Sequence, residues 1–405
     1  MLSLKLAWRN IWRNPKRSQI TVAAVAINTA ILMMTFALMD GMNAGMIHNV
    51  THIMTGDAQL HAPGFRDDRS IYKSISNAKE FAEHAKQADV HATMRSFGGG
   101  LVSVGKKSSG ATFIGIQPRA EEAHFDFPKR LATGTFLTQA KANQAVLGSN
   151  LAKNLGAQLG DEMVVVVQAA DGSMGNELFE VEGILAPVDG QLDQGGLLIR
   201  LSDFEALFST HGQVHEIALR DAKGRDPQAI IDTLEPYTDG QELLSWQKLM
   251  PVFHTMLETN DASMAMMILI LGLGAAMGVM NTMLMATHDR VREYGVQRAL
   301  GTPSRQILRD IVLEASMLAA VSSVVGCIIG IPISLYLQTE GIDLGTGETG
   351  LNFAGVSMMT VWKANLTAMH VVISCIVALI MSVLAAIYPG LKVARISPVE
   401  AMNHV

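Results

Sequence analysis

One short segment has the residue spacing of a phosphate-binding loop but lacks a residue that such a loop needs. Gly100-Leu-Val-Ser-Val-Gly105-Lys106-Lys107 places glycine and lysine as the loop requires. The loop also needs a hydroxyl directly after its lysine to hold magnesium, and Lys107 takes that position. The intervening Leu101–Val104 has the composition of a strand. We therefore expect no nucleotide site, no ATPase and no cofactor on this chain.

Histidines spaced four apart occur twice, as His48/His52 and His211/His215. A metal site needs further ligands and a second shell that orients them. The His211–His215 segment also lacks the glutamate of a zinc-protease helix. No arrangement of nucleophile and base stands out elsewhere. We expect no metal site and no enzymatic activity.

The stretch from Arg290 to Arg309 has the most informative spacing in the chain. It begins as a basic helical segment and breaks at Gly301-Thr302-Pro303, after which Ser304 could cap a new helix. From the residues alone, two interpretations stay open. The first is a short amphipathic helix that docks on a protein partner. The second is an anchor that lies on anionic lipid headgroups.

Four apolar stretches are long enough to cross a bilayer, which takes about 20 residues. Charged residues make up only 17% of the chain, and its net charge of −6 gives no reason to expect a nucleic-acid partner. The predicted spans are 20–40, 261–287, 311–337 and 367–388. The fold class is thus an α-helical membrane domain, with one helix before and three after a large α+β domain.

Lysine and arginine in the short flanking segments predict the orientation, because cytoplasmic loops carry an excess of them. The segment 1–19, the loop 288–310 and the tail 389–405 are basic, whereas the loop 338–366 carries more acidic than basic residues. Both termini are therefore expected in the cytoplasm, and 41–260 on the outer side of the membrane.

The outer domain is expected to contain helical stalks and an α+β body in two lobes, with 117–213 inserted into the rest. Apolar stripes continue beyond two of the spans and indicate stalks that pack together, with a possible kink at Pro251. Cap-type residues Ser202 and Asp226 precede expected helices. Strands are expected at 58–61, 101–104, 112–116, 163–168, 178–184, 196–201 and 215–219, and helices at 150–155, 202–208 and 227–234.

Glycines spaced four apart lie in two of the predicted spans, as Gly274/Gly278 and Gly326/Gly330. This spacing lets helix backbones approach closely. We expect tight helix packing at both pairs, within or between subunits. Glu314, near the cytoplasmic end of the third span, is expected to have a structural or coupling role rather than to relay protons.

Three segments resemble one known family. Arg292-Glu-Tyr-Gly-Val-Gln-Arg-Ala-Leu-Gly301 is similar to the cytoplasmic signature of the FtsX-like/MacB-type ABC transporter permease superfamily. Leu6–Asn14 resembles the segment before its first helix, and Tyr388–Ala401 resembles its C-terminal tail. Within the superfamily the chain is most similar to lipoprotein-releasing permeases of the LolC/LolE type.

The resemblance implies a permease powered by a separate ABC ATPase dimer, which would carry the ATP and magnesium. The permease would transmit force to its outer domain, and it would pair with a second permease subunit, identical or different. The residues implied in coupling are Arg292, Glu293, Gly295, Arg298, Ala299, Leu300 and Gly301, and in the tail Pro389, Pro398 and Glu400.

The cargo is the most open part of the implied function. A long hairpin recruits the periplasmic carrier in one lipoprotein permease, but the corresponding link here is short and turn-like. Its residues are Asp171, Gly172, Ser173, Met174 and Gly175. We expect extraction of lipoproteins or other lipid-anchored substrates from the outer leaflet. The alternatives are an FtsX-like scaffold that controls an extracytoplasmic hydrolase and a MacB-type efflux permease.

Overall fold

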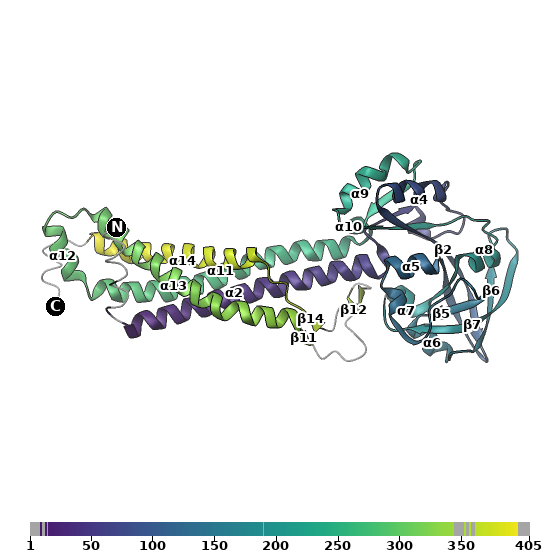
Figure 1. Cartoon of the computed structure of the whole chain (residues 1–405), viewed down its shortest axis with the longest axis horizontal. Coiled ribbons are helices and arrows are strands. Elements are labelled where there is room, and N and C mark those ends of the chain that lie inside the picture. The colour runs from purple at the N-terminus through teal and green to yellow at the C-terminus, as the bar shows by residue number, and fades with distance from the viewer. Residues whose placement is uncertain are drawn as a thin grey trace. The chain divides into compact units, whose positions relative to one another are not determined.

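The computed structural model describes residues 9, 13, 15–188, 190–343, 352, 353, 356, 357 and 361–395. These residues form two compact units (Figure 1). The helical unit contains the described parts of 1–44, 257–344 and 361–405. The α/β unit contains 45–256 and the described residues of 345–360. The predicted Pro398 and Glu400 lie outside the described residues.

The described residues include four helices that are long and apolar enough to cross a membrane, one at each predicted span. Each helix is longer than the span predicted for it, because polar residues extend it beyond the apolar stretch. The helices are α2 (Pro15–Val50), α11 (Pro251–His288), α13 (Ser304–Thr339) and α14 (Ala368–Arg395).

Polar contacts connect α2 and α11 at three levels of the helical unit. Asn260 Nδ2 donates to Asn43 Oδ1 at 2.6 Å, and Asn28 Nδ2 donates to the Leu271 carbonyl at 3.0 Å. Farther along, Thr21 Oγ1 donates to Thr282 Oγ1 at 2.7 Å. Residue numbers rise along one helix as they fall along the other, so the two helices run antiparallel. Hydrogen bonds of this kind help to associate helices where no water competes.

The two glycine pairs differ in their packing. A Cβ atom on Gly326 would lie 2.9 Å from the Ala26 carbonyl oxygen, and one on Gly330 would lie 3.1 Å from Ala30 Cα. This pair therefore brings α13 against α2 within the subunit, as expected. By contrast, a Cβ on Gly278 would meet no described atom within 4 Å. A Cβ on Gly274 would meet only Asn28 Nδ2, at 4.0 Å. This pair therefore makes no close contact with the described residues of its own subunit, and packing between subunits stays a prediction.

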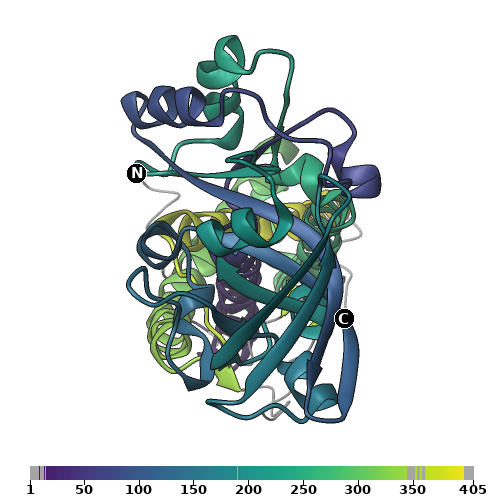
Figure 2. The same cartoon turned by 90° about the vertical axis from the view of Figure 1, so that its right-hand side faces the viewer.

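The α/β unit is built on one mixed sheet (Figure 2). Its described strands follow the order β10-β1-β9-β2-β3-β8-β5-β7-β4, and β6 pairs with both β2 and β7. The strands β2, β3, β8, β5, β7 and β6 therefore close into a ring. Strand bounds are β1 Ala58–His61, β2 Val90–Val104, β3 Lys107–Ile116, β4 Leu131–Gly134, β5 Gln144–Leu147, β6 Glu162–Gln168, β7 Met174–Leu185, β8 Gly196–Arg200, β9 Glu216–Asp221 and β10 Glu242–Ser245.

Short helices connect these strands. They are α3 Phe65–Asp68, α4 Ala78–Gln87, α5 Pro118–His124, α6 Ser149–Leu155, α7 Gly190–Gly195, α8 Leu201–Phe208, α9 Pro227–Leu234 and α10 Trp246–Leu249. Single turns occur at Thr51–Thr55, Phe127–Lys129 and Glu235–Tyr237. Beyond α13, β11 Ile342–Asp343 pairs with β14 Val361–Trp362, and β12 Asn352–Phe353 pairs with β13 Val356–Ser357.

Strand β2 belongs to two parts of the sheet. Residues 90–95 pair with β9, and residues 96–104 pair with β3. The ring thus draws on residues 96–116, which precede the predicted lobe boundary at 117. The division into two lobes stays a prediction.

All seven expected strands and three expected helices are present, with ends shifted by a few residues. Strand β2 is much longer than the predicted 101–104, because it begins at Val90 and continues through Gly98, Gly99 and Gly100. Asp226 caps α9 by accepting from the Gln228 amide at 2.8 Å, as predicted. Two other cap predictions are wrong, because α8 begins at Leu201 and α13 begins at Ser304 itself.

Most residues of the stalk stripes are buried, and the second stripe is divided between two helices, whereas the first lies in one helical run that ends at Thr55. Val50 and Ile53 are almost fully buried, and Ile53 packs into the core of the α/β unit. Trp246 lies in α10, which ends at Leu249, and α11 begins at Pro251. Proline at a first helical position is favoured because its missing N–H would have no partner there. Pro251 therefore starts a helix instead of kinking one.

Candidate coupling site

The segment singled out by its sequence forms a separate helix, α12 (Val291–Ala299), between α11 and α13. Val291 and Gly295 face inward and are buried. On the outer side, Val296 is 46% exposed and Leu300 is 83% exposed. Two exposed apolar residues at this spacing form a continuous surface along one side of the helix.

Gly301 ends α12 in a conformation that suits glycine. Its φ is +93°, in the left-handed region. The Thr302 amide donates to the Gln297 carbonyl, and the Gly301 amide donates to the Arg298 carbonyl, both at 3.0 Å. This pair of hydrogen bonds is the Schellman arrangement that closes many helices. The glycine therefore fixes how the chain leaves α12 and enters α13.

Glu293 has a partner within this chain. Arg13 Nη2 lies 2.6 Å from Glu293 Oε1, and Arg13 Nη1 donates to Glu293 Oε2 at 3.2 Å. The hydrogen bonds from Arg13 lower the pKa of the Glu293 carboxyl, and they raise the pKa of the guanidinium. Both side chains are about half exposed. The pair attaches the segment before α2 to α12.

A second pair lies deeper. Arg290 Nη1 is 3.2 Å from Glu314 Oε2, and the two side chains are about nine-tenths buried. Next to them, burial and the nearby Glu314 carboxylate raise the pKa of the Tyr294 phenol to about 12. The Tyr294 side chain also packs against Ile307 and Val393. Residues of α12, α13 and α14 therefore meet in one cluster.

The end of α14 takes part in this packing. The helix continues through Pro389 to Arg395, seven residues beyond the predicted end of the span at 388. Pro389 and Gly390 are buried, and a Cβ atom on Gly390 would lie 2.5 Å from Leu308 Cδ1. The absence of a side chain at Gly390 thus lets α14 approach the second turn of α13.

The family follows from comparison with known proteins. Residues 18–237 match the MacB-like periplasmic core domain, and residues 265–398 match the FtsX-like permease C-terminal domain. The chain belongs to the MacB-like and FtsX-like permease family. It is an ABC transporter permease of this type.

Two groups of relatives are similar over nearly the whole chain. The lipoprotein-releasing system transmembrane protein LolE of Haemophilus influenzae is 22% identical over 404 residues, covering 95% of this chain and 94% of that protein. LolC of Xylella fastidiosa is 22% identical over 402 residues, covering 96% and 94%. The pyoverdine export ATP-binding/permease protein PvdT of Pseudomonas entomophila is 26% identical over 431 residues. That match covers 99% of this chain but only 59% of PvdT, so the permease spans about three-fifths of that relative's length.

The predicted coupling residues of the permease fall into two groups. Arg292, Glu293, Ala299 and Leu300 are exposed, and Arg298 is partly exposed. Gly295 and Gly301 instead shape the helix. Of the tail residues, Pro389 lies in α14, close to the cluster around Tyr294. The turn at Asp171–Gly175 belongs to the other unit.

That turn is short, as expected. Strand β6 ends at Gln168 and β7 begins at Met174. Asp171 Oδ1 accepts from the Ser173 amide at 2.9 Å and from its hydroxyl at 2.6 Å, while Gly172 has a φ of +83°. Met174 is 70% exposed. A Cβ atom on Gly175 would lie 2.5 Å from the Leu207 carbonyl oxygen, so Gly175 anchors the turn to the body of the unit.

Two features of the site escaped the sequence analysis, the Arg13–Glu293 pair and the close approach at Gly390. The first left a signal, because Glu293 is the single acidic residue between 290 and 309 and residues 1–19 contain only basic charges. The second left none. Glycine in an apolar helix is common, and its partner Leu308 lies far away in sequence.

The histidines and cysteines that the structure describes do not group around a metal site. In the part of the chain that the structure describes, no group of three or more His, Cys, Asp or Glu side chains could hold a metal ion. His215 instead accepts from the Phe97 amide and contacts the Ile71 carbonyl. Cys327 and Cys375 are free thiols whose sulfur atoms lie 3.6 Å apart.

Proposed function

We propose that this permease is driven by a separate ATPase dimer that binds α12. The exposed Val296–Leu300 surface carries this proposal, since apolar side chains at this spacing suit a groove on a partner protein. Its inner side contacts α13 and α14 through Tyr294, and Arg13 attaches the segment before α2. A movement of α12 would therefore be passed to three of the long helices.

The remaining parts of the proposed machine follow from charge and size. The basic flanks favour cytoplasmic termini in the bacterial inner membrane, with the α/β unit in the periplasm. Two ATPase subunits need two docking helices, so a second permease subunit, identical or different, would complete the assembly. Force from ATP hydrolysis would act on the α/β unit without substrate having to cross the bilayer.

For the cargo, we propose lipoproteins or other lipid-anchored substrates. The support is the match to LolE and LolC over nearly the full length of each protein. MacB-type efflux is the second candidate, favoured by the match to PvdT. Release of lipoproteins from proteoliposomes that contain the permease and its ATPase would decide between them. Stimulation of ATP turnover by a small exported molecule, without lipoprotein release, would favour efflux. Co-purification of a wall hydrolase would instead favour the FtsX-like scaffold.

Docking is tested by placing a negative charge at the end of α12, at Arg298, and at the residue that follows the helix, Leu300. Arg298→Glu and Leu300→Glu should each reduce co-purification of the ATPase with the tagged permease about tenfold or more. Arg305→Glu is the matched control, because Arg305 is an exposed arginine in the first turn of α13 rather than on α12. Elution of each variant on size exclusion reports folding. Unchanged co-purification in both α12 variants would contradict the proposal.

A further inference from the structure

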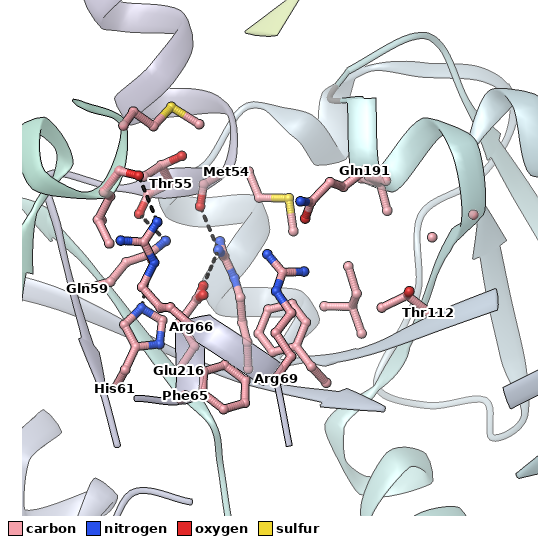
Figure 3. Close-up of a pocket in the computed structure, with 18 of the residues that line it drawn as sticks. Met54, Thr55, Gln59, His61, Phe65, Arg66, Arg69, Thr112, Gln191 and Glu216 are labelled. Atoms are coloured by element: carbon pink, nitrogen blue, oxygen red, sulfur yellow. Dashed lines mark hydrogen bonds and ion pairs between the residues drawn. The ribbon is translucent and has the colours of Figure 1, made fainter. Parts of the chain in front are cut away.

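The α/β unit contains a cavity of about 840 Å³ (Figure 3). This is within the range of small-molecule sites, about 300–1,000 Å³. The cavity lies between the sheet, the α3 segment and the start of α11. The sequence analysis gave no sign of it, because its walls come from segments far apart in the chain.

Apolar side chains form much of the wall. Phe97 and Ile114 project from neighbouring strands of the sheet, and Phe65 comes from α3. Leu249 and Phe253 close the side toward α11. All five side chains are at least nine-tenths buried, so their contact surface is preformed. A wall of this kind favours aliphatic groups over water.

Two arginines that form no ion pair with a described carboxylate also line the cavity. Arg66 Nη2 donates to the Leu249 carbonyl at 2.7 Å, and the Arg69 guanidinium lies 5.6 Å from the centre of the Phe97 ring. Neither arginine forms an ion pair with any residue that the structure describes. In Figure 3 both side chains extend from the α3 segment into the region near Met54. Each guanidinium therefore has N–H groups to offer to a ligand.

The third arginine of the wall is already neutralised. Arg95 is fully buried and contacts Glu121 at 2.6 Å and Glu216 at 2.9 Å. Its Nη1 also donates to the Met54 carbonyl at 2.6 Å. The three arginines and the carboxylates of Glu121 and Glu216 together give the site a net charge of +1. The excess comes from Arg66 and Arg69.

One buried hydrogen-bonding atom in the wall has no partner. His61 Nε2 lies 2.9 Å from Gln59 Oε1, and Gln59 Nε2 donates to the Thr55 carbonyl. His61 therefore donates through Nε2. Its Nδ1 is buried without a hydrogen bond to any described residue, although the side chain is only 2% exposed. This atom has almost no accessible surface, so His61 shapes the wall without offering its Nδ1 to a ligand in the cavity.

We propose that this cavity binds an anionic amphiphile, that is, an acyl chain with a carboxylate or phosphate headgroup. The chain would lie against Phe97, Ile114 and Phe253. The headgroup would accept hydrogen bonds from Arg66 and Arg69. Charge-assisted hydrogen bonds of this type are stronger than neutral ones and reward an anion specifically. The proposal deepens the proposed function, because it places an acyl-binding site in the unit that the ATPase would move.

A photoreactive palmitic acid tests the site directly. The probe is added to the full-length permease in phosphatidylcholine nanodiscs without ATPase, and crosslinked peptides are identified by mass spectrometry. We expect crosslinks in the segments that carry Phe97, Ile114 and Phe253. Arg66→Gln combined with Arg69→Gln should reduce this labelling about tenfold or more, the factor for losing one charge-assisted hydrogen bond. Arg119→Gln, an exposed arginine on α5 away from the cavity wall, is the matched control.

Competitors then define the ligand. Palmitate and lysophosphatidylglycerol should both reduce labelling, and the stronger of them identifies the headgroup. Laurate has four fewer methylenes, so it should compete at least about tenfold more weakly, because each buried methylene strengthens binding about fourfold. Equal competition by hexadecanol would overturn the proposal. So would competition by an acidic peptide without an acyl chain, labelling confined to the helical unit (1–44, 257–344 and 361–405), or no effect of the arginine variants.

This experiment does not depend on docking at α12. A permease that binds the amphiphile but no ATPase would contradict only the proposed drive. A permease that binds its ATPase through α12 but does not label in the cavity would contradict only the amphiphile site.

Discussion

The guanidinium of Arg290 lies 3.2 Å from the carboxylate of Glu314, and both side chains are almost entirely buried. Arg290 immediately precedes α12, while Glu314 lies in the third turn of α13. The pair thus connects the base of the candidate coupling helix to a long helix. It gives Glu314 the structural or coupling role expected from the sequence.

Removing one member of this pair should cost more than removing both. Glu314→Ala would leave a buried guanidinium without its main countercharge, at a cost of about 3–5 kcal/mol. Arg290→Met combined with Glu314→Met should recover most of that loss, because apolar side chains of similar size often replace a buried ion pair without destabilisation. Unfolding of the purified permease in detergent measures both. A double variant no more stable than Glu314→Ala would show that the charges themselves are required.

The two glycine pairs give a matched test of helix packing. Gly326→Ala would place a Cβ atom 2.9 Å from the Ala26 carbonyl oxygen, so α13 and α2 must separate, at a cost of about 1–3 kcal/mol. Gly278→Ala meets no described atom within 4 Å and should be neutral, or stabilising by up to about 1 kcal/mol through helix propensity.

Thermal unfolding of the monomeric permease in detergent checks this difference. If Gly278→Ala destabilised the monomer as much as Gly326→Ala, the assignment of the two surfaces would be wrong. If Gly278→Ala lowered stability only in the assembled complex, Gly278 would lie at an interface between subunits.

The α/β unit should lose stability in mild acid because of His215. Burial lowers the pKa of this imidazole below its usual value of about 6.5, and Nδ1 accepts from the Phe97 amide at 2.9 Å, which leaves no place for a second proton. His61 is shifted in the same direction by burial. Below about pH 6.5 the unfolded chain binds protons that the folded chain refuses, so the free energy of unfolding falls as the pH falls.

Unfolding between about pH 8 and about pH 5 tests this expectation. His215→Gln should lower stability at neutral pH, through the lost packing, and flatten part of the decline in acid. Phe204→Leu is the control, because it weakens the same core without removing a titrating group. It should lower the free energy of unfolding by the same amount at every pH. An unchanged slope in His215→Gln would exclude this residue as the source.

Sequence patterns located the elements better than the contacts between them. Apolar length gave the four long helices, and strand composition gave most of the ring, because these signals are local. The predicted strand at 101–104 covers only the end of β2, because three consecutive glycines at 98–100 lack the composition typical of a strand. In the structure, two of these glycines are needed for close packing: a Cβ on Gly98 would lie 2.5 Å from Phe208, and one on Gly100 would lie 2.6 Å from Val167.

The coupling helix and the cavity also differ in how well the sequence predicted them. The segment 290–301 was found because its residues are contiguous and fold into one helix. The cavity was missed because Arg66, Phe97 and Phe253 are distant in sequence and only the sheet brings them together. Spacing alone also could not distinguish Gly326 from Gly278, since what separates them is the helix that lies opposite.

Variants of the Arg13–Glu293 pair can distinguish two roles of Glu293, contact with the ATPase and contact with Arg13. The resemblance to known permeases implied that this residue contacts the ATPase or shapes the helix, whereas the structure shows it bonded to Arg13. An exposed ion pair adds little to the free energy of unfolding, so breaking this pair should change ATPase docking rather than the stability of the permease. Glu293→Arg places two positive charges together and should release the N-terminal segment from α12, reducing ATPase co-purification about tenfold. Adding Arg13→Glu restores the pair with reversed polarity and should restore most of the co-purification. If Glu293 binds the ATPase itself, the double variant will stay as defective as the single one, and Arg13→Glu alone will have little effect.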